Sequence, residues 1–149
     1  MYQRIFKRQI TQGFQDISRG NFDVVLNIFA PDVHFTFVGD HAMGGDWRDR
    51  KLVRQWFERV HRLFPDLQLT PLHIQVTGWP WDVTAITRFE IRATLPDQSP
   101  YRNQGVQILR IRLGKVVEDH LIEDTQLLVA ALDQIAQSGN AEARAARLA

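Results

Sequence analysis

The sequence predicts an α+β fold, a cone-shaped curved antiparallel sheet packed against three helices. The period of the apolar residues carries this prediction: up to Pro65 it is mostly helical, and after Pro65 it becomes the period of two that is typical of strands. The predicted order is helix, helix, strand, helix, four strands, helix. When helices and strands separate along a chain in this way, the helices gather on one side of the sheet.

Two helices are expected before Pro31. The first ends at Gly20, a residue type that often follows a helix, and its apolar residues are Ile5, Phe6, Ile10, Phe14 and Ile17. The second is capped by Asn21 and stopped by Pro31, and its apolar residues are Phe22, Val25, Leu26 and Phe29.

A strand and a third helix follow. Residues 33–38 are dense in β-branched and aromatic side chains and predict a strand. Gly39, Gly44 and Gly45 predict a loop. Asp49 can cap the helix, which ends at Pro65 and has as its apolar residues Leu52, Val53, Trp56, Phe57, Val60 and Phe64.

Four strands are expected after Pro65, at 67–77, 81–94, 101–113 and 115–123. In the second, residues 85, 87, 89, 91 and 93 are mostly apolar, whereas Arg88, Glu90 and Arg92 point the other way. One face of the sheet is therefore covered and one is wet. A strongly curved sheet closed by helices leaves a cavity.

The last helix is expected from Asp124 to Gln137, with Asp124 or Thr125 as its cap. The remaining residues to 149 are rich in Ala and Arg, and we expect a loosely ordered tail over 137–149. The 149 residues suit one domain, 1–149, since domains typically hold about 100–150 residues.

Composition excludes several classes of protein. A net charge of +1 gives no footprint for nucleic acid, and no apolar run approaches the ~20 residues that span a bilayer. The first residues lack the apolar core of a signal peptide. The absence of cysteine excludes disulfides and thiol chemistry and fits a reducing compartment. We therefore expect a cytoplasmic protein without nucleic-acid or membrane partners.

Three segments resemble one family of folds. They are residues 20–33, the run Gly44-Gly-Asp-Trp-Arg-Asp-Arg with the helix behind it, and the run from Gly114 to Thr125. Together they are similar to nuclear transport factor 2-like proteins of the SnoaL-like, or polyketide cyclase-like, branch, over residues 5–137. The resemblance implies a cone-shaped α+β barrel with a deep apolar pocket, and a homodimer formed through the outer sheet face.

The same family includes ketosteroid isomerases, polyketide cyclases, scytalone dehydratases, epoxide hydrolases and binders without catalysis, so the fold alone does not give the activity. The steroid isomerase residues are absent. Aligned with that group, the carboxylate base falls at Phe37, the tyrosine donor at Gly13 and the acidic donor near Leu109. Without a base and oxyanion donors, we do not expect that activity.

Resemblance to polyketide cyclases makes Asp124 the candidate catalytic acid or base, with His120 assisting. The two share strand parity but lie about 13 Å apart at ~3.3 Å per residue, so they can line one wall without a hydrogen bond. His41, in the glycine-rich bend, is a third candidate. The alternatives are a helix cap for Asp124, a plain sheet residue for His120 and an exposed loop residue for His41.

Candidate ligand-binding residues are mainly aromatic: Phe37, Trp47, Trp56, Phe57, Phe89, Tyr101 and Asn103. Core packing is the alternative for Trp56 and Phe57, which as helix neighbours should point differently, one to the cavity and one to the sheet edge. An unpaired buried amide costs about 1–3 kcal/mol, so Asn103 should meet a ligand or solvent at a pocket mouth.

Either face of the strand at 33–38 can line the pocket. The family pattern favours Phe35 and Phe37 on the inner face, with His34 on the other. The five histidines show no His-x-His or His-x3-His pair, and we expect neither a metal nor a cofactor.

Two functions remain open. The first is a cofactor-independent cyclase or isomerase that acts by acid–base proton transfer on a hydrophobic carbonyl compound. The second is a non-catalytic module of the same fold, which binds a hydrophobic ligand or serves as a dimeric interaction protein.

Overall fold

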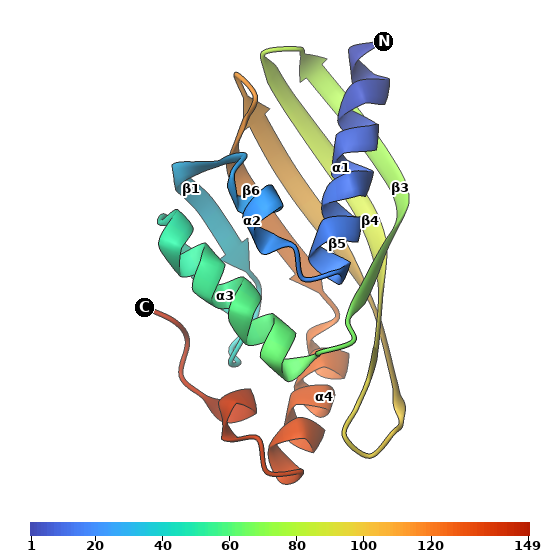
Figure 1. Ribbon diagram of the computed structural model, residues 1–149, viewed down its shortest axis with the longest axis vertical. Coiled ribbons are helices and arrows are strands. Elements are labelled where there is room, and N and C mark those ends of the chain that lie inside the picture. The colour runs from blue at the N-terminus through green and yellow to red at the C-terminus, as the bar shows by residue number, and fades with distance from the viewer.

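The computed structural model, which describes residues 1–149, has the predicted α+β class and one curved sheet of six strands (Figure 1). The helices are α1 (Tyr2–Ser18), α2 (Phe22–Leu26), α3 (Arg50–Leu63) and α4 (Thr125–Gln137), followed by the 3-10 helix η1 (Ala141–Arg144). The strands are β1 (Phe29–Phe37), β2 (Gly45–Trp47), β3 (Gln68–Trp79), β4 (Asp82–Thr94), β5 (Pro100–Arg112) and β6 (Lys115–Glu123).

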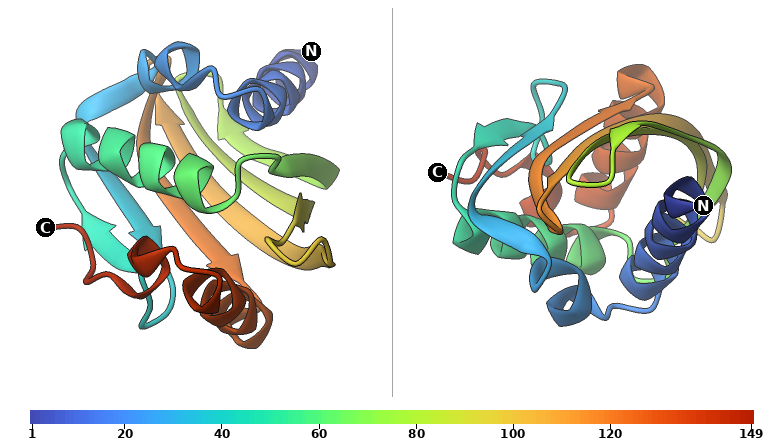
Figure 2. Two further views of the ribbon diagram at one scale, coloured as in Figure 1. Left: turned by 60° about the horizontal axis from the view of Figure 1, so that its bottom comes forward. Right: turned by 90° about the horizontal axis from the view of Figure 1, so that it is seen from above.

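The strand order is β2-β1-β6-β5-β4-β3, and only the β1–β6 pair is parallel. Helices α1, α2 and α3 lie against one face of the sheet, within its curve, while α4 closes one end (Figure 2). This is the cone of sheet and three helices that the sequence predicts. The sheet remains open, with β2 and β3 as its edges.

Inner-facing residues alternate along the strands and form the core. On β1, Val33, Phe35 and Phe37 are buried, and His34 points to the outer face, as the family pattern indicated.

Asp49 caps α3 as predicted, since its carboxylate accepts a hydrogen bond from the backbone N–H of Lys51 at 2.8 Å. Asn21 precedes α2 without making a side-chain cap, so that part of the prediction is wrong.

The second helix is shorter than predicted, because the helical pattern continues into a strand. It ends at Leu26, and Phe29 and Pro31 belong to β1 instead. The backbone N–H of Val116 donates to the carbonyl of Ile28, which ties this stretch to β6. Pro31 has no N–H to donate, and it lies where the β1–β6 register shifts, an irregularity that tolerates proline.

Two further differences concern short segments. β2 has only three residues, too few to show a period, and the sequence predicted a loop there. The tail expected to be loosely ordered contains η1 and contacts the core: the indole N–H of Trp47 donates to the carbonyl of Leu148 at 2.8 Å. None of the helices is long and apolar enough to cross a bilayer.

Candidate functional site

An apolar cavity lies between α1, α3, α4 and the inner face of the sheet. Fourteen of its 17 lining residues are hydrophobic. Its aromatic wall consists of Phe14, Trp56, Phe57, Phe64, Phe89 and Tyr101. The volume is about 50 Å³, well below the ~300–1,000 Å³ typical of small-molecule sites.

A wider groove adjoins this cavity between α1, α2 and the sheet. It has a volume of about 570 Å³ and shares Phe14, Ile17, Gln107 and Asp119 with the cavity wall. Exposed apolar residues line its open side, namely Ile5, Val24 and Ile28. The two spaces together are large enough for a small molecule, and Ile17, Gln107 and Asp119 stand where they meet.

The cavity wall contains two carboxyl groups, both from β6. Asp119, Leu121 and Glu123 alternate along this strand and all face inward. Asp119 is 2% exposed, and burial raises the pKa of its carboxyl group to about 7. Burial also raises the pKa of Glu123 to about 8, with no hydrogen bond to offset it. Both groups can therefore exchange a proton near neutral pH, in apolar surroundings.

Gln107 on β5 is the polar neighbour of Asp119. Its amide Nε2 lies 3.5 Å from the Oδ2 of Asp119, while its own Oε1 and the Oδ1 of Asp119 have no partner. Thr87, opposite Gln107 in the sheet, is also fully buried with an unpartnered hydroxyl. Unpaired buried polar atoms cost about 1–3 kcal/mol each, so a ligand that pairs with them gains by it.

The predicted catalytic residues lie elsewhere. Asp124 is exposed, does not line the cavity, and accepts a hydrogen bond from the backbone N–H of Leu127 at 3.3 Å as the cap of α4. His120 shares its parity and points to the outer face, where its Nδ1 lies 2.7 Å from the Thr36 hydroxyl. The structure therefore gives no support to Asp124 and His120 as a pair inside the pocket.

His41 belongs to the bend rather than to the cavity. Its Nδ1 accepts a hydrogen bond from the backbone N–H of Met43, and its Nε2 lies 3.2 Å from the carbonyl oxygen of Val38. Partial burial lowers the pKa of His41, which keeps the ring neutral. This arrangement shapes the bend and leaves no nitrogen directed at the cavity.

Four of the seven predicted ligand-binding residues line the cavity: Trp56, Phe57, Phe89 and Tyr101. Trp56 and Phe57 both do so, whereas we expected one of them to face the sheet edge. Phe37 and Trp47 are buried in the core outside the lining. Burial also raises the pKa of the Tyr101 phenol, so this group stays protonated.

Asn103 is buried, but its amide is already satisfied. Its Nδ2 donates to the Tyr101 hydroxyl at 2.8 Å and to the Asp124 carbonyl at 3.0 Å. Its Oδ1 accepts from the backbone N–H of Gln104. The side chain thus fixes the exit of β6 and needs no ligand, contrary to the expectation drawn from the cost of an unpaired amide.

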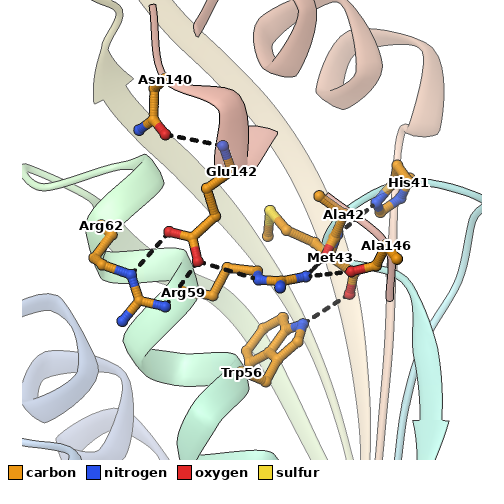
Figure 3. A network of polar contacts seen from close by, with 9 residues as sticks. All are labelled: His41, Ala42, Met43, Trp56, Arg59, Arg62, Asn140, Glu142 and Ala146. Carbon is orange, nitrogen blue, oxygen red and sulfur yellow. Dashed lines mark hydrogen bonds and ion pairs between the residues drawn. The ribbon is translucent and has the colours of Figure 1, made fainter. Parts of the chain in front are cut away.

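A network of polar contacts joins α3 to the bend and to the tail (Figure 3). Arg59, 8% exposed, donates through Nη1 to the carbonyls of Ala42 at 2.8 Å and Ala146 at 2.9 Å. The indole N–H of Trp56 donates to the carbonyl of Met43 at 2.7 Å. These contacts fix Met43 and Trp56, which both line the cavity.

Comparison with known proteins identifies the family to which this chain belongs. The family described as "SnoaL-like domain" matches residues 10–119. The chain belongs to this family. No curated protein matches the sequence.

Solved structures of similar proteins agree in fold with this SnoaL-like domain. Wild-type IdmH, a putative polyketide cyclase from Streptomyces antibioticus, is 23% identical, with a TM-score of 0.67 over 83% of this chain and 92% of its own. AclR, a putative hydroxylase from Streptomyces galilaeus, is 20% identical, with a TM-score of 0.67 over 83% and 78%. TerC, co-crystallised with polyporic acid, is 14% identical, with a TM-score of 0.73 over 86% and 97%.

A second polar cluster lies on the outer face of the SnoaL-like sheet. His34 and Glu118 are opposite each other in the β1–β6 register, and His120 lies opposite Thr36. This cluster could not be predicted from the sequence, because its members come from strands about 80 positions apart that meet only in the fold. His34, Glu118 and His120 form a group of side chains whose nitrogen and oxygen atoms lie close enough together to hold a metal ion.

The raised pKa of Glu123 predicts a dependence of stability on pH. A carboxyl group with a higher pKa in the folded state stabilises the fold below its unfolded pKa, near 4.5, and this contribution is lost as pH rises through about 8. Glutamine at this position does not titrate. We therefore expect Glu123→Gln to gain stability over the wild type between pH 5 and 9, by on the order of 1–3 kcal/mol at the upper end.

Thermal unfolding of both proteins across this range measures the difference. A difference that stays flat with pH would mean that Glu123 is solvated in the folded state.

Proposed function

We propose that this SnoaL-like domain binds a hydrophobic small molecule in the cavity and its adjoining groove and catalyses an acid–base proton transfer on it. The substrate class is a hydrophobic carbonyl compound, and the reaction is a cyclisation or isomerisation that needs no cofactor. The observation that carries the proposal is the position of two carboxyl groups, Asp119 and Glu123, in an otherwise apolar cavity.

Glu123 is the proposed general base. Removing a proton from a carbon next to a carbonyl group needs a base whose pKa lies near the working pH, and burial raises the pKa of Glu123 to about 8. The negative charge that forms on the carbonyl oxygen needs a hydrogen-bond donor. The Nε2 of Gln107 is a candidate donor, held at the junction of cavity and groove beside Asp119.

A non-catalytic binding protein is the second candidate, and the small inner cavity favours it. A volume of about 50 Å³ holds only part of a substrate, so the reacting carbon must reach Glu123 from the groove. Turnover distinguishes the two candidates, since a binding protein would hold the same ligands without converting them.

A tryptophan at the junction tests where the ligand binds. Ile17 lines both the cavity and the groove, so Ile17→Trp is expected to fill the passage between them. Hydrophobic ketones and polycyclic phenols, screened by native mass spectrometry and titration calorimetry, should bind the wild type and lose at least ten-fold in affinity in this variant.

Leu127→Trp is the matched control, because it adds the same indole to an exposed position of α4 outside the cavity. Equal affinity of Ile17→Trp and the wild type for every ligand bound would place the binding site elsewhere.

The homodimer through the outer sheet face remains a prediction. Ile86 and Ile122, 43% and 44% exposed, point outward from β4 and β6 and support it. Light scattering coupled to gel filtration measures the mass in solution.

A further inference from the structure

We infer that the outer face of the sheet holds a divalent transition-metal ion, such as zinc, bound by His34, Glu118 and His120. This site is separate from the proposed cavity, since its side chains point to the opposite face of the sheet. One nitrogen from each histidine and one carboxylate oxygen lie within 4.8 Å of one another. The two imidazole rings are in contact, with their centroids 5.0 Å apart.

The ligand types select the class of metal. Two imidazoles with one carboxylate suit zinc, cobalt or nickel, whereas magnesium and calcium prefer oxygen ligands alone. Bonds of about 2.0–2.2 Å require the three ligand atoms to come closer together than they are. Glu118 has a flexible, half-exposed side chain that can make this adjustment, with 38% of its side-chain surface accessible.

A neighbouring hydroxyl group fixes one of the ligand rings. The Thr36 hydroxyl lies 2.7 Å from Nδ1 of His120, and a hydroxyl that accepts the Nδ1 proton leaves the Nε2 lone pair free for the metal. Nε2 of this ring already lies 3.6 Å from Oε1 of Glu118. Such a partner fixes the orientation of a ligand ring, and losing it typically weakens metal binding about 10–100-fold.

Asp46 on β2 supplies a fourth group and the second negative charge. Its Oδ1 lies 2.8 Å from Nε2 of His34, so it can either join the ion or hold the ring. With Glu118 it balances a divalent cation. The nearest positive charge is Arg110, whose Nη1 is 3.8 Å from Glu118 but whose other nitrogens are held by both oxygens of Asp82 at 3.0 and 3.1 Å.

Every ligand stands on a strand, which keeps the site rigid. His34 and Glu118 are directly opposite in the β1–β6 pair, and Thr36 is opposite both His120 and Asp46. Strand positions hold a constellation more precisely than loops do. The side chains of His34, His120 and Glu118 are 22%, 25% and 38% exposed, so in the single chain an ion can enter from solvent with water in the remaining coordination positions.

Titration of the tag-free, chelator-treated protein with zinc chloride tests the site. We expect one ion per chain with a dissociation constant of 10 μM or tighter, and a visible absorption band with cobalt that is typical of nitrogen ligation. His34→Gln and His120→Gln should each weaken zinc binding at least ten-fold, and Thr36→Val should weaken it less. His73→Gln, on β3 at the opposite edge of the sheet, is the matched control.

Three results would overturn the inference: no binding tighter than 100 μM, a loss in His73→Gln equal to that in His120→Gln, or half an ion per chain. Circular dichroism of each variant shows that the fold is retained. None of these readouts depends on ligand binding in the cavity, so they are independent of the proposed function.

Discussion

Arg59→Met is expected to lower the free energy of unfolding by about 2–4 kcal/mol, the largest effect on stability that we predict. Arg59 is buried, and its Nη1 satisfies the carbonyl groups of Ala42 and Ala146. Methionine fills a similar volume but donates nothing, so the buried carbonyl of Ala42 is left unpaired, while the carbonyl of Ala146, on an exposed residue, turns to water. Each unpaired buried group costs about 1–3 kcal/mol.

Denaturant unfolding measures this loss, and Arg62→Met is the matched control. Arg62 is one turn further along α3 and forms two hydrogen bonds of 2.8 Å with Glu142, but it is exposed. Exposed ion pairs contribute about 0–1 kcal/mol, so the control should stay near the wild type. A similar loss in both variants would mean that the network of Figure 3 stabilises through its ion pairs alone.

Limited proteolysis of the same two variants separates local from global loss. The tail carries Arg144 and Arg147, both exposed and therefore open to trypsin once the tail leaves the core. The carbonyl of Ala146 between them is held by Arg59. Arg59→Met should be cut here faster than Arg62→Met under native conditions, because the segment opens without unfolding of the sheet.

The overall arrangement of elements follows from local patterns in the sequence. β4 alternates so regularly that its inner face, including Phe89, could be assigned from the sequence alone, and the cap of α3 followed from Asp49. Contacts between distant segments could not be assigned. The tail has no apolar period, yet Arg59 and Trp47 bind its backbone carbonyls, which present no side-chain pattern to detect.

The sequence-based choice of Asp124 and His120, which do not line the cavity, has a simple geometric cause. The resemblance to polyketide cyclases assigned the acidic residue to Asp124, at the exit of β6. His120 was then chosen because it lies four residues earlier and so shares the strand parity of Asp124. A shift of one residue moves every side chain to the other face of a sheet. The buried Leu121 was the available signal, since Asp119 and Glu123 share its parity and therefore its side of the sheet.

Glu123→Gln is expected to reduce turnover by about 10²–10⁴-fold while ligand affinity changes little. General acid–base catalysis typically contributes this much, and glutamine keeps the size of the side chain without a proton to exchange. Because the active form of a base is the deprotonated one, turnover in the wild type should rise with pH through about 8. The substrate is any ketone from the binding screen that the wild type converts.

Asp124→Asn tests the alternative catalytic residue, because it removes the carboxylate that the family resemblance alone would choose as the base. Asp124 is exposed and caps α4, and the amide oxygen of asparagine caps a helix about as well as a carboxylate, so this variant should keep the stability of the wild type to within roughly 0.5 kcal/mol and leave turnover nearly unchanged. Glu90→Gln makes the same chemical change as Glu123→Gln on the outer face of β4 and controls for it. A larger loss of turnover in Asp124→Asn than in Glu123→Gln would move the catalytic centre from the cavity to the exit of β6.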